Sequence, residues 1–160
     1  MKETFDLTWL IAQDAFWSGI AALGFAILFN VPKRTLFGCV IGGAAGHAIR
    51  TGLMESGATI ELATLAGATV IGFLGTYFAR RCSAPAAIFT VSAAIPMVPG
   101  VFAYRAMLGL INLADADVAF GQDILVETMI NATKTGFILA AIAGGTIIPQ
   151  LLFQRVKPIV

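Results

Sequence analysis

Five ionisable side chains stand inside long apolar stretches of the sequence, where a charge needs an explanation: Asp14, His47, Arg50, Arg105 and Lys134. Such a group near the centre of a bilayer costs at least about 2.5 kcal/mol on insertion scales, which makes each one a candidate for function. Three of the five are firm bases and one is an acid. Since one acid neutralises only one base, the set keeps a positive surplus, which suits an anionic substrate such as a carboxylate.

The spacing of these residues adds to the pattern. His47 and Arg50 are three positions apart and share a helix face, as do Asn131 and Lys134. The reference pKa of histidine, about 6.5, makes His47 a candidate for proton coupling, together with Asp14. Structural alternatives stay open. Arg50 could snorkel to the interface, Asp14 and Lys134 could form a structural ion pair, and His47 could be a packing residue.

Two prolines and a glycine interrupt one apolar stretch: Pro96, Pro99 and Gly100 lie about 15 Å from its cytoplasmic end, near the midplane of a core about 30 Å thick. Prolines at this spacing break a helix. A second half-helix that starts near Pro99 would direct its free N–H groups and positive dipole end at the midplane, where an anion could bind. Tyr104 and Arg105 lie one turn further on. The alternatives are a proline kink that only shapes the bundle, and an exposed turn that carries Arg105.

The elements that must position these residues are five apolar segments, each close to the roughly 20 residues that span a bilayer. At 1.5 Å per residue, the five ionisable residues all lie about 6–11 Å below the outer ends of their segments, in one layer. The second segment is rich in glycine and is the weakest of the set, so a re-entrant or interfacial segment is its alternative. We predict membrane-spanning helices at 8–29, 35–54, 60–79, 86–111 (broken at 96–100) and 128–153.

The loop charges are sorted by sign. Basic pairs occupy alternate polar stretches, the acids occupy the others, and 112–127 is an acidic separator. Because short basic loops stay in the cytoplasm, the N-terminus is predicted outside and the C-terminus inside. The chain is 58% hydrophobic and 12% charged, against about 25% charge in soluble domains. We therefore expect an all-α polytopic membrane protein with one transmembrane domain over 1–160, and no nucleic-acid partner. The basic pairs are Lys33 and Arg34, Arg80 and Arg81, and Arg155 and Lys157.

Small residues four positions apart within the segments predict close helix–helix packing. The three pairs are Gly42 and Gly46, Ala68 and Gly72, and Ala140 and Gly144.

Three segments carry a family resemblance: Phe29-Asn-Val-Pro-Lys-Arg, Gly46-His-Ala-Ile-Arg, and the run from Phe89 to Tyr104 with Ile95-Pro-Met-Val-Pro-Gly at its centre. In this order they resemble the C-terminal membrane half of the threonine/serine exporter (ThrE) family, and within it the YjjB-type small subunit. The resemblance covers nearly the whole chain, and its proline-glycine motif is the most specific part.

The resemblance implies a multi-pass protein of the bacterial inner membrane, an exporter coupled to the proton gradient, and not an enzyme. We expect no cofactor and no metal. A YjjP-like polypeptide would supply the N-terminal half, and the substrates would be threonine and serine or succinate. Five spans are few for a transporter, and many transporters consist of two related halves, so copies of the chain itself could also complete it. A non-transporting scaffold subunit and a channel are the alternative functions.

Overall fold

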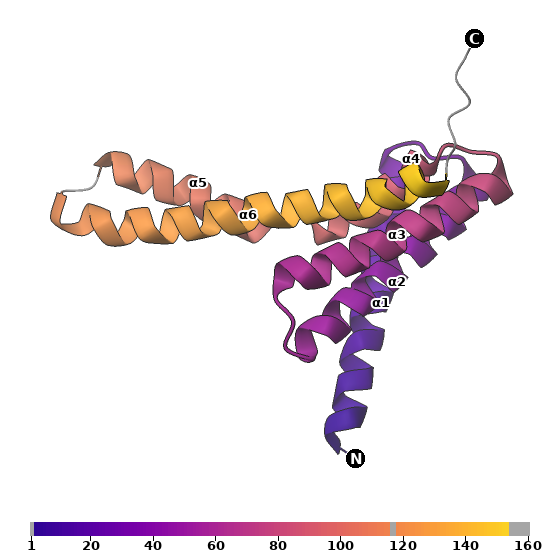
Figure 1. Cartoon of the computed structure of the whole chain (residues 1–160), viewed down its shortest axis with the longest axis horizontal. Coiled ribbons are helices and arrows are strands. Elements are labelled where there is room, and N and C mark those ends of the chain that lie inside the picture. Colours follow the sequence, from indigo (N-terminus) through magenta and orange to yellow (C-terminus); the bar gives the residue numbers. More distant parts are fainter. Residues whose placement is uncertain (1, 116–117, 154–160) are drawn as a thin grey trace, which may run out of the picture. The chain divides into compact units, whose positions relative to one another are not determined.

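The described residues of the computed structural model, 2–115 and 118–153, form helices joined by short turns and contain no strand (Figure 1). This confirms the predicted all-helical class. In chain order the elements are α1 (Lys2–Leu28), the 3-10 helix η1 (Lys33–Thr35), α2 (Leu36–Glu55), α3 (Ile60–Cys82), α4 (Ala86–Ala94), the 3-10 helix η2 (Ile95–Met97), α5 (Gly100–Asp115) and α6 (Val118–Phe153).

Left-handed backbone at three turns ends the first three long helices. Asn30, Gly57 and Ser83 have φ values of 56°, 93° and 47°. After α1 the Val31 N–H donates to the Ala26 carbonyl at 2.9 Å, which satisfies a carbonyl that the helix end leaves open. A proline follows two residues after both Asn30 and Ser83. These separators act as the stop signals that the sequence predicts.

The chain divides into two compact units, Met1–Met97 together with Ala141–Val160, and Val98–Ala140. The structure describes 2–97 and 141–153 of the first unit. There α2 packs against α1, α3 and α4, and α1, α2 and α3 are seen side by side (Figure 1). The second unit contains α5 and the first part of α6, which meet where Gly109 faces Thr128.

Glycines bring α2 into close contact with its neighbours. A Cβ atom at Gly67 of α3 would lie 2.5 Å from the Gly46 carbonyl oxygen of α2, and one at Gly42 would lie 3.1 Å from the Ala93 Cβ of α4. The predicted packing at Gly42 and Gly46 is thus confirmed. Because protein covers α2 on several sides, this helix needs fewer lipophilic side chains than a helix that faces lipid.

The glycines of α6 correct one prediction. A Cβ at Gly72 of α3 would lie 2.8 Å from the Gly145 carbonyl oxygen, and one at Gly145 would lie 2.7 Å from the Ala68 Cβ, which confirms the Ala68 and Gly72 pair. The pair of Ala140 and Gly144 was wrong, because a Cβ at Gly144 would meet nothing within 4 Å. A helix turns by about 100° per residue, so the neighbouring Gly145 takes the contact instead.

Charge was a poor guide to where helices end. The stretch 112–127, predicted as a separator, is helical up to Asp115 and again from Val118. Acidic residues make a segment unsuited to lipid, but they do not break a helix as proline does. The 36 residues of α6 extend for about 54 Å, well beyond a hydrocarbon core of about 30 Å. Thr128 is therefore not the first residue of a helix.

Three helices are long and apolar enough to cross a membrane: the segments Asp6–Leu28 of α1, Ile60–Cys82 of α3 and Gly121–Phe153 of α6. The segments on the two sides of the break at 98–99 make a fourth if they act as one span. Among the described helices α2 does not meet this criterion. The protein is thus a helical membrane protein by composition, while five spans and the orientation of the termini remain predictions.

Candidate functional site

Three of the five predicted ionisable residues come together inside the first unit. The Asp14 carboxylate of α1 lies 3.3 Å, measured at Oδ2, from Nδ1 of His47 on α2. The Thr51 hydroxyl donates to the same oxygen at 2.5 Å. Arg50 lies close enough to interact electrostatically with both Asp14 and His47. We call Asp14, His47, Arg50 and Thr51 the Asp14 cluster.

The packing of α1 on α2 positions this cluster. Gly43, His47 and Thr51 follow one another at four-residue intervals and share one stripe of α2. A Cβ at Gly43 would lie only 2.6 Å from the Ala22 Cβ of α1. Asp14 lies two turns before Ala22 on the same stripe of α1, so the close contact at Gly43 brings the carboxylate against the imidazole.

Two polar atoms of the Asp14 cluster are buried without a hydrogen-bond partner among the described residues: Nε2 of His47 and Nε of Arg50. The His47 residue is only 8% exposed. Its Nδ1 faces a carboxylate, which assigns the proton of the neutral ring to Nδ1 and leaves a lone pair on Nε2. Buried polar groups are nearly always paired. Nε2 is therefore an open position for a proton, a water molecule or a ligand group.

The predicted helix break is confirmed and adjoins this cluster. After α4 the chain tightens into η2, which contains Pro96, and the α-helix resumes at Gly100, one residue after Pro99. The Pro96 carbonyl lies beside the His47 ring. Met97, the last residue of η2, is fully buried, and its Cε would lie 2.7 Å from a Cβ at Gly67. The first segment of the broken helix thus ends against the same side of α2 and α3 as the cluster.

The start of α5 has the form expected of an anion-binding helix end. The Pro99 carbonyl accepts the Ala103 N–H at 3.0 Å, and the Gly100 N–H donates to the Val98 carbonyl at 2.8 Å. The Val101 and Phe102 amides belong to the first turn of α5, where the helix itself supplies no carbonyl four residues earlier to accept their N–H groups. A carboxylate role for this helix end stays a prediction.

The other predicted residues belong to the second unit. Tyr104, Arg105 and Lys134 are exposed, and Asn131 is buried, with its Nδ2 donating to the Glu127 carbonyl at 2.9 Å. Lys134 Nζ lies 5.4 Å from the centre of the Phe102 ring, a favourable cation–π arrangement. That these residues share one layer with the Asp14 cluster stays a prediction.

Sequence reasoning missed two features. Thr51 stands four positions after His47 and therefore on its face, which was an available signal. The second is a pocket of about 240 Å³ in the second unit, where a base meets an acid from the stretch that was predicted as a separator. It is lined by Arg105, Leu108, Gly109, Asn112, Ile124, Glu127 and Thr128. Within the described ranges no group of three or more His, Cys, Asp or Glu residues could hold a metal ion.

A buried imidazole with a partly exposed carboxylate and guanidinium beside a broken helix is typical of membrane transport proteins. The family model described as threonine/serine exporter, ThrE, matches residues 14–152. The chain belongs to this family, which confirms the predicted resemblance, while the YjjB-type assignment stays a prediction.

A protein of Haemophilus influenzae (strain ATCC 51907 / DSM 11121 / KW20 / Rd), described only as an uncharacterized protein, is 44% identical over 152 residues, which make up 94% of this chain and 50% of the relative. The chain thus spans about half the length of this curated relative. No solved structure matches the chain.

Proposed function

We propose that the chain is a subunit of a proton-coupled secondary exporter of small carboxylates or amino acids in the bacterial inner membrane. Succinate, threonine and serine are the candidate substrates. The observation that carries this proposal is the Asp14 cluster, where a buried imidazole has one nitrogen on a carboxylate and the other open beside a helix break. Membership of the exporter family supports it.

The proton step uses His47. In the neutral ring Nδ1–H donates to Asp14, and an arriving proton binds the lone pair of Nε2. The resulting imidazolium forms an ion pair with the Asp14 carboxylate and presents a new N–H donor near the Pro96 carbonyl. Loss of the proton from Nε2 on the other side of the membrane restores the neutral ring. Proton occupancy would thereby change the charge and the hydrogen bonding next to the helix break.

The substrate step uses the surplus of positive charge. Arg50 forms no ion pair with Asp14 within 4 Å in the described part of the chain, so its guanidinium is free to bind a carboxylate through two parallel hydrogen bonds. We further propose that Lys134, Arg105 and the amides at the start of α5 contribute to the same anion path. Occupation of the site by an anionic substrate would then respond to the protonation of His47, because the imidazolium adds a positive charge that attracts the carboxylate.

The length of the relative supports a second half. The Haemophilus influenzae protein is about twice as long as the matched region, and transporter sites commonly lie between two halves. We propose that a YjjP-like membrane subunit supplies this half, with a second copy of the chain as the alternative.

Reconstitution in liposomes tests the function. The chain is incorporated with and without the YjjP-like subunit, and the flux of labelled succinate, threonine and serine is measured under an imposed pH gradient. We expect gradient-dependent flux only when both are present. Full flux with the partner alone would favour a scaffold role for this chain, and flux that ignores the pH gradient would favour a channel.

Two variants separate the proposed roles. His47→Gln should abolish flux driven by the pH gradient but retain counterflow, in which labelled substrate exchanges for unlabelled substrate without net proton movement. Arg50→Gln should abolish both. The matched control is Arg34→Gln, which removes one positive charge from an exposed residue of η1 and should leave both intact. Unchanged gradient-driven flux in His47→Gln would refute the coupling role.

A further inference from the structure

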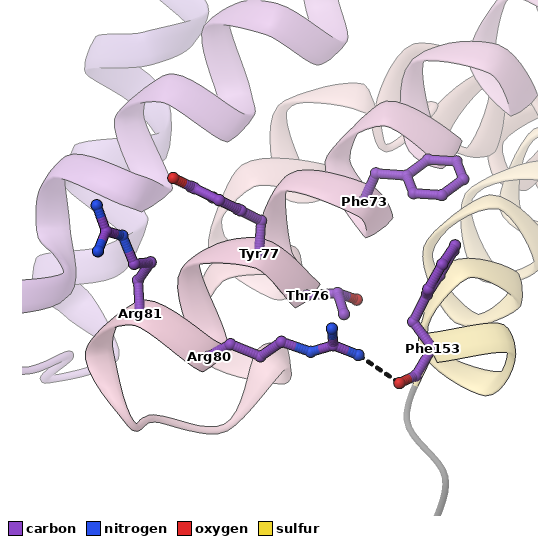
Figure 2. A pocket seen from close by; sticks show the side chains of 6 residues that line it. All are labelled: Phe73, Thr76, Tyr77, Arg80, Arg81 and Phe153. Carbon is purple, nitrogen blue, oxygen red and sulfur yellow. Dashed lines mark hydrogen bonds between the residues drawn. The ribbon is translucent and has the colours of Figure 1, made fainter.

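A surface pocket of about 350 Å³ lies at the basic end of α3 and shares no lining residue with the Asp14 cluster (Figure 2). Five of its lining residues come from the last three turns of α3, and one comes from the end of α6. They are Phe73, Thr76, Tyr77, Arg80, Arg81 and Phe153.

The walls of this pocket are aromatic. The Phe73 and Phe153 rings meet edge to face, with centroids 5.7 Å apart. Tyr77 stands one turn after Phe73 on α3 and is also largely exposed. Phe73, Tyr77 and Arg81 follow one another at four-residue intervals, so these two aromatic residues and the arginine share one face of the helix. An apolar ligand chain could lie along this face with a polar group at the arginine end.

The two arginines at the rim are in different situations. The Arg80 guanidinium donates to the Phe153 carbonyl, as the dashed line in Figure 2 shows, which ties the end of α6 to α3. Arg81 makes no hydrogen bond or ion pair with any residue that the structure describes, and its guanidinium points away from Phe153 (Figure 2). The described residues that line the pocket include no acidic one. One arginine therefore fixes the wall, while the other keeps its donors open.

We propose that this pocket binds an anionic phospholipid, with the phosphate on Arg81 and an acyl chain along Phe73, Tyr77 and Phe153. Basic pockets beside membrane helices are suited to lipid phosphates. The aromatic wall favours an amphipathic ligand over a small anion, because a small anion would make no contact with these rings. This site requires that the protein resides in a membrane, and it is independent of transport. A failed lipid experiment would leave the proposed exporter function untouched.

Native mass spectrometry of the purified full chain, released from detergent with added phosphatidylglycerol, tests this site. Phosphatidylethanolamine with the same acyl chains is the zwitterionic comparison. We expect retained phosphatidylglycerol and, in Arg81→Gln, an apparent affinity weakened by about fivefold, the effect of one arginine near a lipid headgroup. Arg81→Lys, which keeps the charge, should retain most of the binding. Arg34→Gln is the matched control, because it removes the same charge from an exposed residue of another turn.

Three results would overturn the proposal. Equal loss in Arg81→Gln and Arg34→Gln would show general attraction of lipid to a basic surface. Equal retention of the two lipids by the unsubstituted chain would show that the pocket does not distinguish an anionic headgroup from a zwitterionic one. Complete displacement of phosphatidylglycerol by millimolar inorganic phosphate would show a small-anion site without lipid recognition. Circular dichroism of each variant confirms that it is folded, so that a loss of binding reports on the pocket.

Discussion

The contact between α2 and α3 allows a sharp test of the packing that holds His47 in place. In Gly67→Ala the new methyl group would lie 2.5 Å from the Gly46 carbonyl oxygen and 2.7 Å from the Met97 Cε. The methionine can rotate away, because its side chain is flexible. The carbonyl belongs to the backbone of α2 one residue before His47, so it can yield only if the two helices separate.

The magnitude follows from two opposing effects. Replacing a helical glycine by alanine stabilises a helix by about 0.5–1 kcal/mol, whereas overpacking a tight contact costs about 1–3 kcal/mol. Gly24→Ala in α1 makes the same chemical change where a Cβ would meet nothing within 4 Å. The helix gain is shared, so the difference in unfolding free energy between the two variants isolates the overpacking cost, about 1–3 kcal/mol.

Reversible unfolding in mixed micelles, with a rising fraction of denaturing detergent and circular dichroism as the signal, measures this difference. Gly24→Ala should unfold at or above the denaturant fraction of the unsubstituted chain, and Gly67→Ala clearly below the fraction at which Gly24→Ala unfolds. Equal stability of the two variants would refute the close approach of α2 and α3, and with it the account of how His47 is covered.

Two further predictions follow from the same unit. Thr51→Val removes the hydroxyl that donates to Asp14 at 2.5 Å. It should lower the unfolding free energy by about 1.5–3 kcal/mol, the range for hydrogen bonds to charged groups. Thr51→Ser keeps the hydroxyl and should keep the stability, so equal stability of the two variants would contradict the contact. Cys82 is partly exposed and Cys39 is buried, so a membrane-impermeant maleimide should label Cys82 only after cells are opened and Cys39 only after denaturation. Labelling of Cys82 in intact cells would reverse the predicted orientation.

The helices and the break between them could be predicted because their signals are local. Proline and glycine act on the backbone within one or two residues, and the break at 98–99 follows from such residues alone. The gathering of His47 and Arg50 on one face is also local, since helical periodicity fixes it. The pairing of Asp14 with His47 was not predictable, because it depends on the rotation of α1 against α2, which small residues such as Gly43 set.

The misplaced boundaries have a common cause. Hydropathy reports which residues tolerate lipid, and it was used to predict where helices end. At 112–127 suitability for lipid and helical structure do not coincide. Acidic residues make this stretch unsuited to lipid, yet most of it is helical. Gly144 and Gly145 were also indistinguishable by spacing, since either fits a four-residue pattern. Only the rotation of α6 against α3 decides which of them makes the contact.

Helix α2 is less apolar than a membrane-spanning helix, and it also carries the proposed proton site. Both facts have one physical cause. Hydropathy measures how well a helix suits lipid, yet α2 is covered by α1, α3 and α4. The glycines that permit this coverage lower its hydropathy, and His47 and Arg50 lower it further. The same coverage buries Nε2 of His47, which has no hydrogen-bond partner among the described residues. Because η2 ends against the same packed region, the proposed coupling would let a change of charge at His47 act on the segment that leads into the helix break. A glycine-rich, charged helix at the centre of a membrane bundle should therefore be read as a buried element that positions a site, and its low hydropathy as a consequence of that position.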